Sequence, residues 1–330
     1  MRLEGARVLV TGSDGFIGSH LVERLQAEGA DVRAFCFYNS NGSFGWLDDL
    51  DEKARSALDL RLGDIRDAGA VDAATEGVDI VLHLAALIAI PYSYVSPASF
   101  IETNVNGTFN VLEAARRHRV ARVVHTSTSE VYGTPDVVPI TEDHPLKGQS
   151  PYSASKIAAD KLCEAWACSF DVPVVVLRPF NTYGPRQSAR AVIPTILSQL
   201  LAGHQPLRLG SLRPRRDFTY VGDTVEGFVK AACADLEAGQ VVQLGTGTDV
   251  SIGELVGVAS RLLGIEVEVQ EEEERLRPER SEVQVLRSDP SRAAALLGWR
   301  ARTDLDEGLA QTLEWFKVRV DPDRALRYQR

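Results

Sequence analysis

A glycine-rich turn between a short apolar strand and a helix is the feature that most constrains this chain. Residues 8–10 read VLV and predict a buried strand, and residues 11–18 follow with TGSDGFIG. Apolar residues then recur at helical spacing as far as Gly29, which is expected to cap the helix. Glycines in a strand–turn–helix unit allow close backbone approach, and the helix N-terminus faces a pyrophosphate. The segment therefore predicts a dinucleotide site, with contacts from Gly12, Asp14, Gly15, Phe16, Ile17 and Gly18. The alternative is a glycine turn that binds no ligand.

The end of the second predicted strand, residues 32–37, should carry the residue that reads the adenosine ribose. An Asp or Glu there favours NAD, whereas an Arg nearby accepts the phosphate of NADP. This chain has neither, since residues 36–39 read CFYN. Asn39 or Ser40 would suit either cofactor. We expect NAD, because no Arg replaces the missing acid, and NADP stays the alternative.

Two further strands are predicted to lead to the same site. The first, residues 60–65, ends at an Asp expected to contact adenine, and the second, residues 80–86, ends in small residues that let a cofactor lie against the backbone. The helix expected over residues 99–118 carries Asn104 in its interior, interpreted as a helix-kinking, water-binding residue rather than plain surface. The expected cofactor contacts from these segments are Asp64, Ile65, Leu84, Ala85, Ala86 and Asn104.

A run of small hydroxyl residues follows the fifth predicted strand. Residues 122–124 lead as a buried strand into HTSTSEVYG, residues 125–133. In an open parallel sheet the carboxyl ends of the strands are where ligands bind. This edge offers hydroxyls, a carboxylate and a phenol, so we expect it to perform chemistry on a sugar with a bound nicotinamide.

A tyrosine and a lysine four residues apart follow on a predicted helix. Ser150 suits the N-cap and Pro151 the first turn, which places Tyr152 and Lys156 on one helix face. An ammonium beside a phenol favours the phenolate, so Tyr152 is the expected base for a sugar hydroxyl. The predicted catalytic residues are Thr128, Ser129, Glu130, Tyr152 and Lys156, the last two also contacting the cofactor.

The composition changes after the sixth predicted strand, residues 172–177, and the sequence RPFNTYGPR at 178–186. Short strands and helices follow, with arginines expected to hold a substrate diphosphate. The predicted substrate-binding residues are Asn181, Arg190, Val192, Arg216 and Arg277. The expected fold class is α/β, a Rossmann-type doubly wound parallel sheet with a smaller C-terminal α/β substrate-binding lobe. The expected division is 1–184 for NAD(P) and 185–330 for the substrate, with segments of the second part free to return to the first.

Charge and cysteine usage exclude several classes of protein. The net charge is −10, without the Lys/Arg cluster that binds nucleic acid or anionic membrane. No apolar run approaches the ~20 residues of a membrane helix, and residues 1–5 have no signal-peptide core. The four cysteines lack a C-x-x-C pair, and the six histidines lack metal-ligand spacing. We expect a cytoplasmic protein with reduced cysteines and no metal.

Residues 11–18, the Tyr152/Lys156 pair and residues 178–185 together resemble the extended short-chain dehydrogenase/reductase family. The resemblance covers nearly the whole chain, including RDFTYV at 216–221 and LGW at 297–299. It implies an NAD(P) domain and a lobe for a nucleotide-diphosphate sugar. In this family the 4,6-dehydratases carry a Glu where Glu130 stands, whereas C4-epimerases usually carry a small neutral residue.

The chain is most similar to the 4,6-dehydratases of legionaminic-acid biosynthesis. The likeness is carried by residues 38–40, 46–48, 85–92, 149–156 and 185–194. Members of that group act on an N-acetylglucosamine nucleotide, reported as the GDP form. The resemblance therefore implies a 4,6-dehydratase acting on a GDP- or UDP-N-acetylglucosamine-type hexose.

The resemblance also implies a mechanism. Tyr152, assisted by Lys156 and Thr128, removes the C4 hydroxyl proton as C4 is oxidised. Glu130 then takes the C5 proton and protonates the water leaving from C6, because Ser129 is a poor acid. The cofactor is regenerated and is expected to stay bound.

Three other readings compete with the dehydratase. UDP-glucuronate decarboxylases share Thr-Ser-Glu but usually lack the Ser-Ala-Ser of residues 153–155. A C4-epimerase is disfavoured by Glu130, and a non-catalytic nucleotide-sensing scaffold has no need of Thr128, Tyr152 and Lys156 together.

A homodimer is expected as well. The predicted helices 99–118 and 151–169 carry apolar residues on more than one face. The face expected to pair across a twofold axis holds Phe109, Leu112, Leu162 and Trp166.

Overall fold

A seven-stranded parallel sheet forms the centre of the molecule. The structure is a computed structural model, and it describes residues 1–322 and 325–326. The strand order is β11-β6-β5-β4-β1-β2-β3, and every neighbouring pair is parallel. The strands are β1 (Arg7–Thr11), β2 (Asp31–Phe37), β3 (Asp59–Gly63), β4 (Ile80–His83), β5 (Arg122–Thr126), β6 (Val174–Pro179) and β11 (Val241–Leu244). Their Val- and Leu-rich sequences are those of strands buried on both faces.

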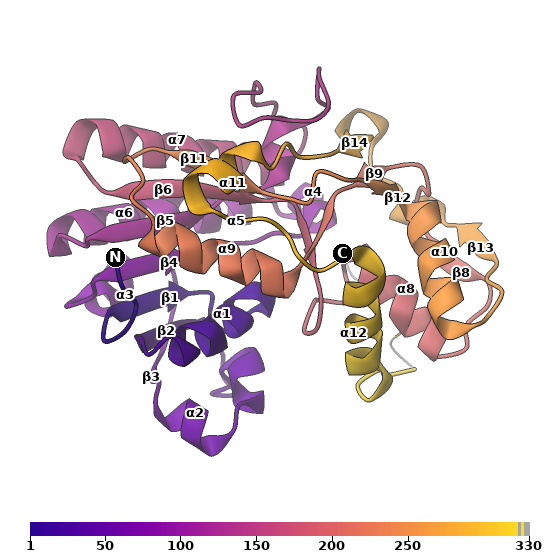
Figure 1. Cartoon of the computed structure of the whole chain (residues 1–330), viewed down its shortest axis with the longest axis horizontal. Coiled ribbons are helices and arrows are strands. Elements are labelled where there is room, and N and C mark those ends of the chain that lie inside the picture. Colours follow the sequence, from indigo (N-terminus) through magenta and orange to yellow (C-terminus); the bar gives the residue numbers. More distant parts are fainter. Residues whose placement is uncertain (323–324, 327–330) are drawn as a thin grey trace.

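Helices cover both faces of this sheet (Figure 1). Val8 and Val10 pack with one set of helices, and Leu9 between them packs with the other, because successive side chains of a strand point to opposite faces. The first face holds α1 (Phe16–Ala27), α9 (Val221–Cys233) and α11 (Ser291–Leu297), and the second holds α3 (Ala68–Thr75), α6 (Gly107–His118) and α7 (Pro151–Phe170). This doubly wound arrangement confirms the predicted fold class.

The strand order reverses between β1 and β4. The chain proceeds from β1 outward through β2 to β3, then returns to β4 on the other side of β1. The glycine turn after β1 and the segment after β4 therefore diverge at one edge of the sheet. Ligands of doubly wound proteins bind at such a switch point.

The C-terminal part forms a smaller lobe with its own apolar core. Leu197, Leu255, Leu309 and Leu313 are among its buried residues. In Figure 1, α8, α10, β8 and β13 gather at the end of the molecule away from the large sheet. The elements are β7 (Asn181–Tyr183), α8 (Val192–Leu201), β8 (Leu207–Leu209), β9 (Arg215–Arg216), β10 (Phe218–Tyr220), β12 (Val250–Ser251), α10 (Ile252–Leu263), β13 (Val269–Glu271), η4 (Glu273–Arg275), η5 (Glu279–Ser281), β14 (Val285–Leu286) and α12 (Leu305–Lys317).

The chain crosses between the two parts after residue 184. β11 pairs with β6 at the edge of the large sheet, and α9 packs against that sheet as well. The division at residues 184/185 stays a prediction, and residues 323–324 and 327–330 of the predicted lobe lie outside the described residues.

Several predicted boundaries shift in the structure. The helix expected over 99–118 consists of α5 (Pro97–Phe100), a π-helical segment η2 (Ile101–Asn106) and α6. The third and fourth strands end at Gly63 and His83, before the predicted residues 65 and 86, because the chain turns there into loops that line a cavity. The remaining elements are η1 (Gly45–Asp49), α2 (Glu52–Ser56), α4 (Ile90–Val95) and η3 (Ser129–Tyr132).

No helix among the described residues is long and apolar enough to cross a membrane. The four cysteines are free thiols, of which Cys36 and Cys163 are buried and Cys168 is exposed.

Candidate active site

The glycine turn after β1 leaves no room for a side chain at Gly12 or Gly18. Gly12 has a φ of +71°, and a Cβ there would lie 2.8 Å from the Ala85 backbone nitrogen. A Cβ at Gly18 would overlap the Gly12 carbonyl oxygen. The Thr11 hydroxyl accepts hydrogen bonds from the backbone nitrogens of Leu84 (3.1 Å) and Ala85 (3.2 Å), which joins the turn to the loop after β4. The turn thus brings the N-terminus of α1 to the switch point with its backbone uncovered.

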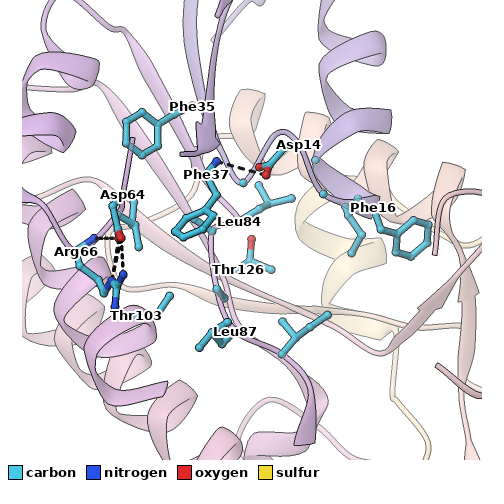
Figure 2. A pocket seen from close by; sticks show the side chains of 18 of the residues that line it. Asp14, Phe16, Phe35, Phe37, Asp64, Arg66, Leu84, Leu87, Thr103 and Thr126 are labelled. Atoms are coloured by element: carbon cyan, nitrogen blue, oxygen red, sulfur yellow. Dashed lines mark hydrogen bonds and ion pairs between the residues drawn. The ribbon is translucent and has the colours of Figure 1, made fainter. Parts of the chain in front are cut away.

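A cavity of about 520 Å³ lies along this switch point (Figure 2). Its lining includes Asp64, Ile65 and Arg66 from the loop after β3, and Thr126, Tyr152 and Lys156 from β5 and α7. A largely apolar cavity against a helix N-terminus fits a dinucleotide. Of the predicted cofactor contacts, the following line it: Gly12, Asp14, Gly15, Phe16, Ile17, Gly18, Asp64, Ile65, Leu84, Ala85, Ala86, Tyr152 and Lys156.

Asn39 and Asn104 do not line this cavity. The Asn39 side chain bonds within its own loop, donating to the carbonyl oxygens of Phe37 and Ser43 and accepting from the backbone nitrogens of Asn41 and Ser43. Its polar atoms are therefore all used by the loop that follows β2.

Asn104 lies buried in the π-helical segment. Its oxygen accepts from the Leu87 nitrogen (2.8 Å), and its nitrogen donates to the Leu87 oxygen (2.9 Å) and the Ser155 hydroxyl (2.9 Å). The interpretation of Asn104 as a water-binding residue is corrected, because protein groups satisfy its side chain. It fixes the loop after β4 against α7, and both line the cavity.

Local capping builds the end of β5 and the start of α7, where the catalytic residues are predicted. Thr128 caps η3 by accepting from the Glu130 backbone nitrogen (3.2 Å), while Ser129 is buried. The predicted start of α7 is confirmed, since Ser150 and Ser153 form a capping box and Pro151 is in the first turn. The first two turns of α7 thus carry Tyr152 and Lys156 to the end of β5.

Burial controls the protonation of the Tyr152 phenol. Its ring packs edge-on against Phe100 at 6.2 Å. Burial raises the pKa of Tyr152 above its usual range, outweighing the hydrogen bond with Thr128 that lowers it, and the charge of Glu130 raises it further. The ammonium of Lys156 donates to the Thr126 carbonyl oxygen at 2.5 Å. The expectation that Lys156 gives Tyr152 a lowered pKa is therefore wrong for this arrangement.

Burial lowers the pKa of Lys156 to about 8 from its usual 10.5. Between about pH 8 and pH 10.5, Lys156 is protonated in the unfolded chain but largely neutral in the folded chain. The contribution of Lys156 to the free energy of unfolding therefore rises with pH in this range. We expect the free energy of unfolding of the parent protein, relative to Lys156→Met, to rise by about 2 kcal/mol from pH 7 to pH 10. The measurement is urea unfolding at both pH values. Lys161→Met, on the exposed face of the same helix, is the control and should show no such rise. If the parent protein and Lys156→Met differed in free energy of unfolding by the same amount at both pH values, the prediction would be contradicted.

A buried ionic network behind the cavity was not predicted from the sequence. Asp160, one helical turn after Lys156, accepts from the Ser127 hydroxyl (2.8 Å) and from Arg178 (2.9 and 3.1 Å). Burial by itself raises the pKa of Asp160, but His125 and Arg178 hold it below its usual value. Ser127 lines the cavity. The network therefore fixes the end of β5 to α7. In the sequence, only the four-residue spacing of Lys156 and Asp160 indicated that Asp160 faces the same way as Lys156.

Two of the predicted substrate arginines lie together on the lobe side. Glu282 accepts from both Arg216 (3.1 Å) and Arg277 (3.4 Å). Burial lowers the pKa of Arg216, whereas the charge of Glu130 raises it, which indicates that the Glu130 carboxylate lies near Arg216. Glu282 was not predicted from the sequence.

The other predicted substrate residues are more dispersed. The Asn181 side-chain oxygen is buried and lacks a hydrogen-bond partner among the described residues, as expected of a group that awaits a ligand donor. Val192 begins α8, and Arg190 is exposed in the preceding loop. Among the described residues, no group of three or more His, Cys, Asp or Glu side chains is placed to hold a metal ion.

The fold, the glycine turn and the cavity define an NAD(P)-binding protein of the Rossmann type with a Tyr–Lys pair at its catalytic edge. The family model described as GDP-mannose 4,6 dehydratase matches residues 9–312. The chain belongs to the extended short-chain dehydrogenase/reductase family of nucleotide-sugar epimerases and dehydratases.

Similar proteins come from both branches of this family. A UDP-glucose 4-epimerase from Mycolicibacterium smegmatis is 36% identical over 94% of this chain and 98% of its own. A dTDP-glucose 4,6-dehydratase from Actinoplanes sp. is 34% identical over the same shares. The structure of a dTDP-glucose 4,6-dehydratase from Streptomyces venezuelae with NAD bound superposes with a TM-score of 0.84 at 32% identity, covering 95% of this chain and 97% of that one. The chain is therefore a nucleotide-sugar dehydratase or 4-epimerase.

Proposed function

We propose that the protein is a nucleotide-diphosphate-sugar 4,6-dehydratase that uses NAD. The observation that carries this proposal is the position of Glu130. Its charge acts on the phenols of Tyr152 and Tyr94 and on the guanidinium of Arg216. A 4-epimerase needs one acid–base group at C4, whereas a dehydratase needs a second one for C5 and C6. Glu130 is that second group.

The residues divide the proton transfers between them. Tyr152 accepts the proton of the C4 hydroxyl, and the Thr128 hydroxyl is hydrogen-bonded to its phenol. A bound nicotinamide supplies the hydride acceptor for C4 and the hydride donor for C6. The 4-ketone makes the C5 proton acidic, so Glu130 removes it and then protonates the departing C6 hydroxyl, which leaves as water. When hydride is added at C6, C5 takes up a proton that comes from the solvent. The raised pKa keeps the Tyr152 phenol protonated. The positive charge that an oxidised nicotinamide would supply when bound would favour ionisation of this phenol.

Arg216 and Arg277 are proposed to hold the substrate diphosphate, and Asn181 to accept a hydrogen bond from the substrate. Displacing Glu282 from the arginines would free their donors for phosphate oxygens. We propose a GDP- or UDP-N-acetylglucosamine-type hexose as the substrate, on the likeness to the legionaminic-acid dehydratases. NAD is proposed because the dehydratase of Streptomyces venezuelae binds it.

A C4-epimerase is the second candidate, favoured by the similarity to the Mycolicibacterium smegmatis protein. A UDP-glucuronate decarboxylase would share the first oxidation but lose carbon dioxide. The purified protein is to be incubated with UDP-, GDP- and dTDP-hexoses and the products analysed by mass spectrometry. Loss of water from one of them supports the dehydratase. Loss of carbon dioxide, or an isomer of unchanged mass, would replace it with one of the alternatives.

A homodimer is proposed from the outer face of α6 and α7. Phe109 and Phe170 are 42% and 48% exposed, and the Trp166 ring packs between them at 5.6 and 5.3 Å. Leu112 was wrongly placed on this face, because it is buried in the core of its own protomer. An exposed aromatic group of this kind on adjacent helices is suited to pairing with a second copy.

We expect the parent protein to sediment as a dimer at micromolar concentration and Phe109→Arg to sediment as a monomer, because a buried unpaired charge opposes the contact. Sedimentation velocity is the measurement. Ile265→Arg, an exposed apolar position on the lobe, is the control and should remain dimeric. A monomeric parent protein would contradict the proposal.

A further inference from the structure

The end of β2 lacks the acid that usually reads the adenosine ribose. In doubly wound dinucleotide sites an Asp or Glu there binds the 2′-hydroxyl and an Arg accepts a 2′-phosphate. Here Phe37 and Tyr38 occupy that end with 57% and 63% exposure, and all polar atoms of the Asn39 side chain bond within the loop. The end of the strand therefore presents neither an acid nor a free amide to a ribose at this point.

A carboxylate reaches the same place from the glycine turn. Asp14 directly precedes Gly15, and its Oδ2 accepts a hydrogen bond from the Phe37 backbone nitrogen at 3.4 Å, so the carboxylate lies at the end of β2. Figure 2 shows this bond, with the Phe37 ring between Asp14 and the Asp64–Arg66 pair in that view. Both Asp14 and Phe37 line the cavity. The Asp14 side chain thus stands where a β2 acid would stand.

The loop after β2 holds Asp14 in this position. The Trp46 backbone nitrogen donates to the Asp14 carbonyl oxygen (3.1 Å), and a Cβ at Gly45 would overlap that carbonyl. The backbone of Asp14 is therefore clamped between the start of α1 and η1. A side chain fixed in this way is pre-organised for a ligand.

The negative charge of Asp14 is not neutralised by the described residues around it. No cation among the described residues pairs with it, and the nearby Asp48 is neutralised by Arg55 at 3.1 Å. Burial, with the charges of Asp14 and Asp48, raises the pKa of the Cys36 thiol to about 12. The two cations that line the cavity are engaged elsewhere, Arg66 with Asp64 (2.6 Å) and Lys156 with the Thr126 carbonyl oxygen. This corner would accept ribose hydroxyls and repel a 2′-phosphate.

We infer that Asp14 is the residue that selects NAD over NADP. From its position in the glycine turn, it performs the role that an acid at the end of β2 has in other dinucleotide sites. The carboxylate accepts hydrogen bonds from the adenosine ribose hydroxyls. A 2′-phosphate, which carries nearly two negative charges, would meet an unpaired carboxylate at close range. This inference concerns the dinucleotide alone and holds for a dehydratase, an epimerase or a decarboxylase.

The test is the relative affinity for NADH and NADPH, measured by competition for the purified protein. The parent protein should prefer NADH by about 100-fold or more, since a hydrogen bond to a charged group and the avoided repulsion each contribute roughly tenfold. Asp14→Asn keeps the size of the side chain and an acceptor for the Phe37 nitrogen but removes the charge. Its preference should fall by at least about tenfold, with NADPH binding more tightly than to the parent protein. The dinucleotide extracted from the purified variant should then include NADP.

Two variants serve as controls for this test. Asp48→Asn removes a neighbouring charge that Arg55 already neutralises, so its preference should match that of the parent. Asp14→Ser provides a second loss of charge if Asp14→Asn fails to fold, as judged by thermal unfolding. An unchanged ratio in both Asp14 variants, or an equal effect of Asn39→Ala, would overturn the inference. Absence of any dinucleotide binding by the parent would instead overturn the proposed function.

Discussion

The Tyr152→Phe variant is expected to lose turnover by a factor of about 10²–10⁴, because the C4 hydroxyl then lacks its base. The phenol is buried and hydrogen-bonded with Thr128, whereas the ring itself packs against Phe100. Phenylalanine keeps that packing, so the variant should fold and bind the dinucleotide normally. Mixed with substrate, it should show no rise in the absorbance of reduced nicotinamide.

The control for this variant is Tyr220→Phe, whose hydroxyl donates to Gln311 in the lobe at 2.8 Å. It removes the same atom from a tyrosine outside the catalytic edge and should keep the parent rate. If Tyr152→Phe oxidised C4 at the parent rate, Tyr152 would not be the base. The Thr128 hydroxyl would then be the nearest group left to examine.

The Glu130→Gln variant should fail at a later point than Tyr152→Phe. C4 oxidation stays possible, but the base for C5 and the acid for C6 are lost, so product formation should fall by about 10²–10⁴. With the true substrate, the absorbance of reduced nicotinamide should rise and persist without product. Little deuterium should enter C5 from heavy water. The rise of this signal in one variant and its absence in the other distinguish the two residues.

Glu164→Gln, an exposed acid on α7 that pairs with Lys161, is the matched control and should leave both signals unchanged. Product formation by Glu130→Gln at near the parent rate would remove the main support for the dehydratase. An epimerase, which needs no acid–base group at C5, would then be the better assignment. The same stopped-flow and mass-spectrometric measurements report every outcome.

The sequence by itself determined the features that depend on neighbouring residues. The strand, glycine turn and helix of residues 7–27 follow from apolar spacing and from glycines that allow close approach. The start of α7 follows from Ser150, Pro151 and Ser153, because a capping box forms within four residues. These local rules, repeated along the chain, were sufficient for the fold class and for the segments that meet at the switch point.

Only the tertiary structure decided what those segments do to one another. Asp14 accepts a hydrogen bond from Phe37, 23 positions later in the sequence, and Glu282 accepts one from Arg216, 66 positions earlier. No local sequence pattern predicts either contact. The pKa of Tyr152 was expected to be lowered by Lys156, yet it is raised, because burial depends on how α4, α5 and α7 pack together. Local sequence determines backbone conformation through short-range sterics and hydrogen bonds, whereas charge and solvation at the site depend on residues that only folding brings into contact.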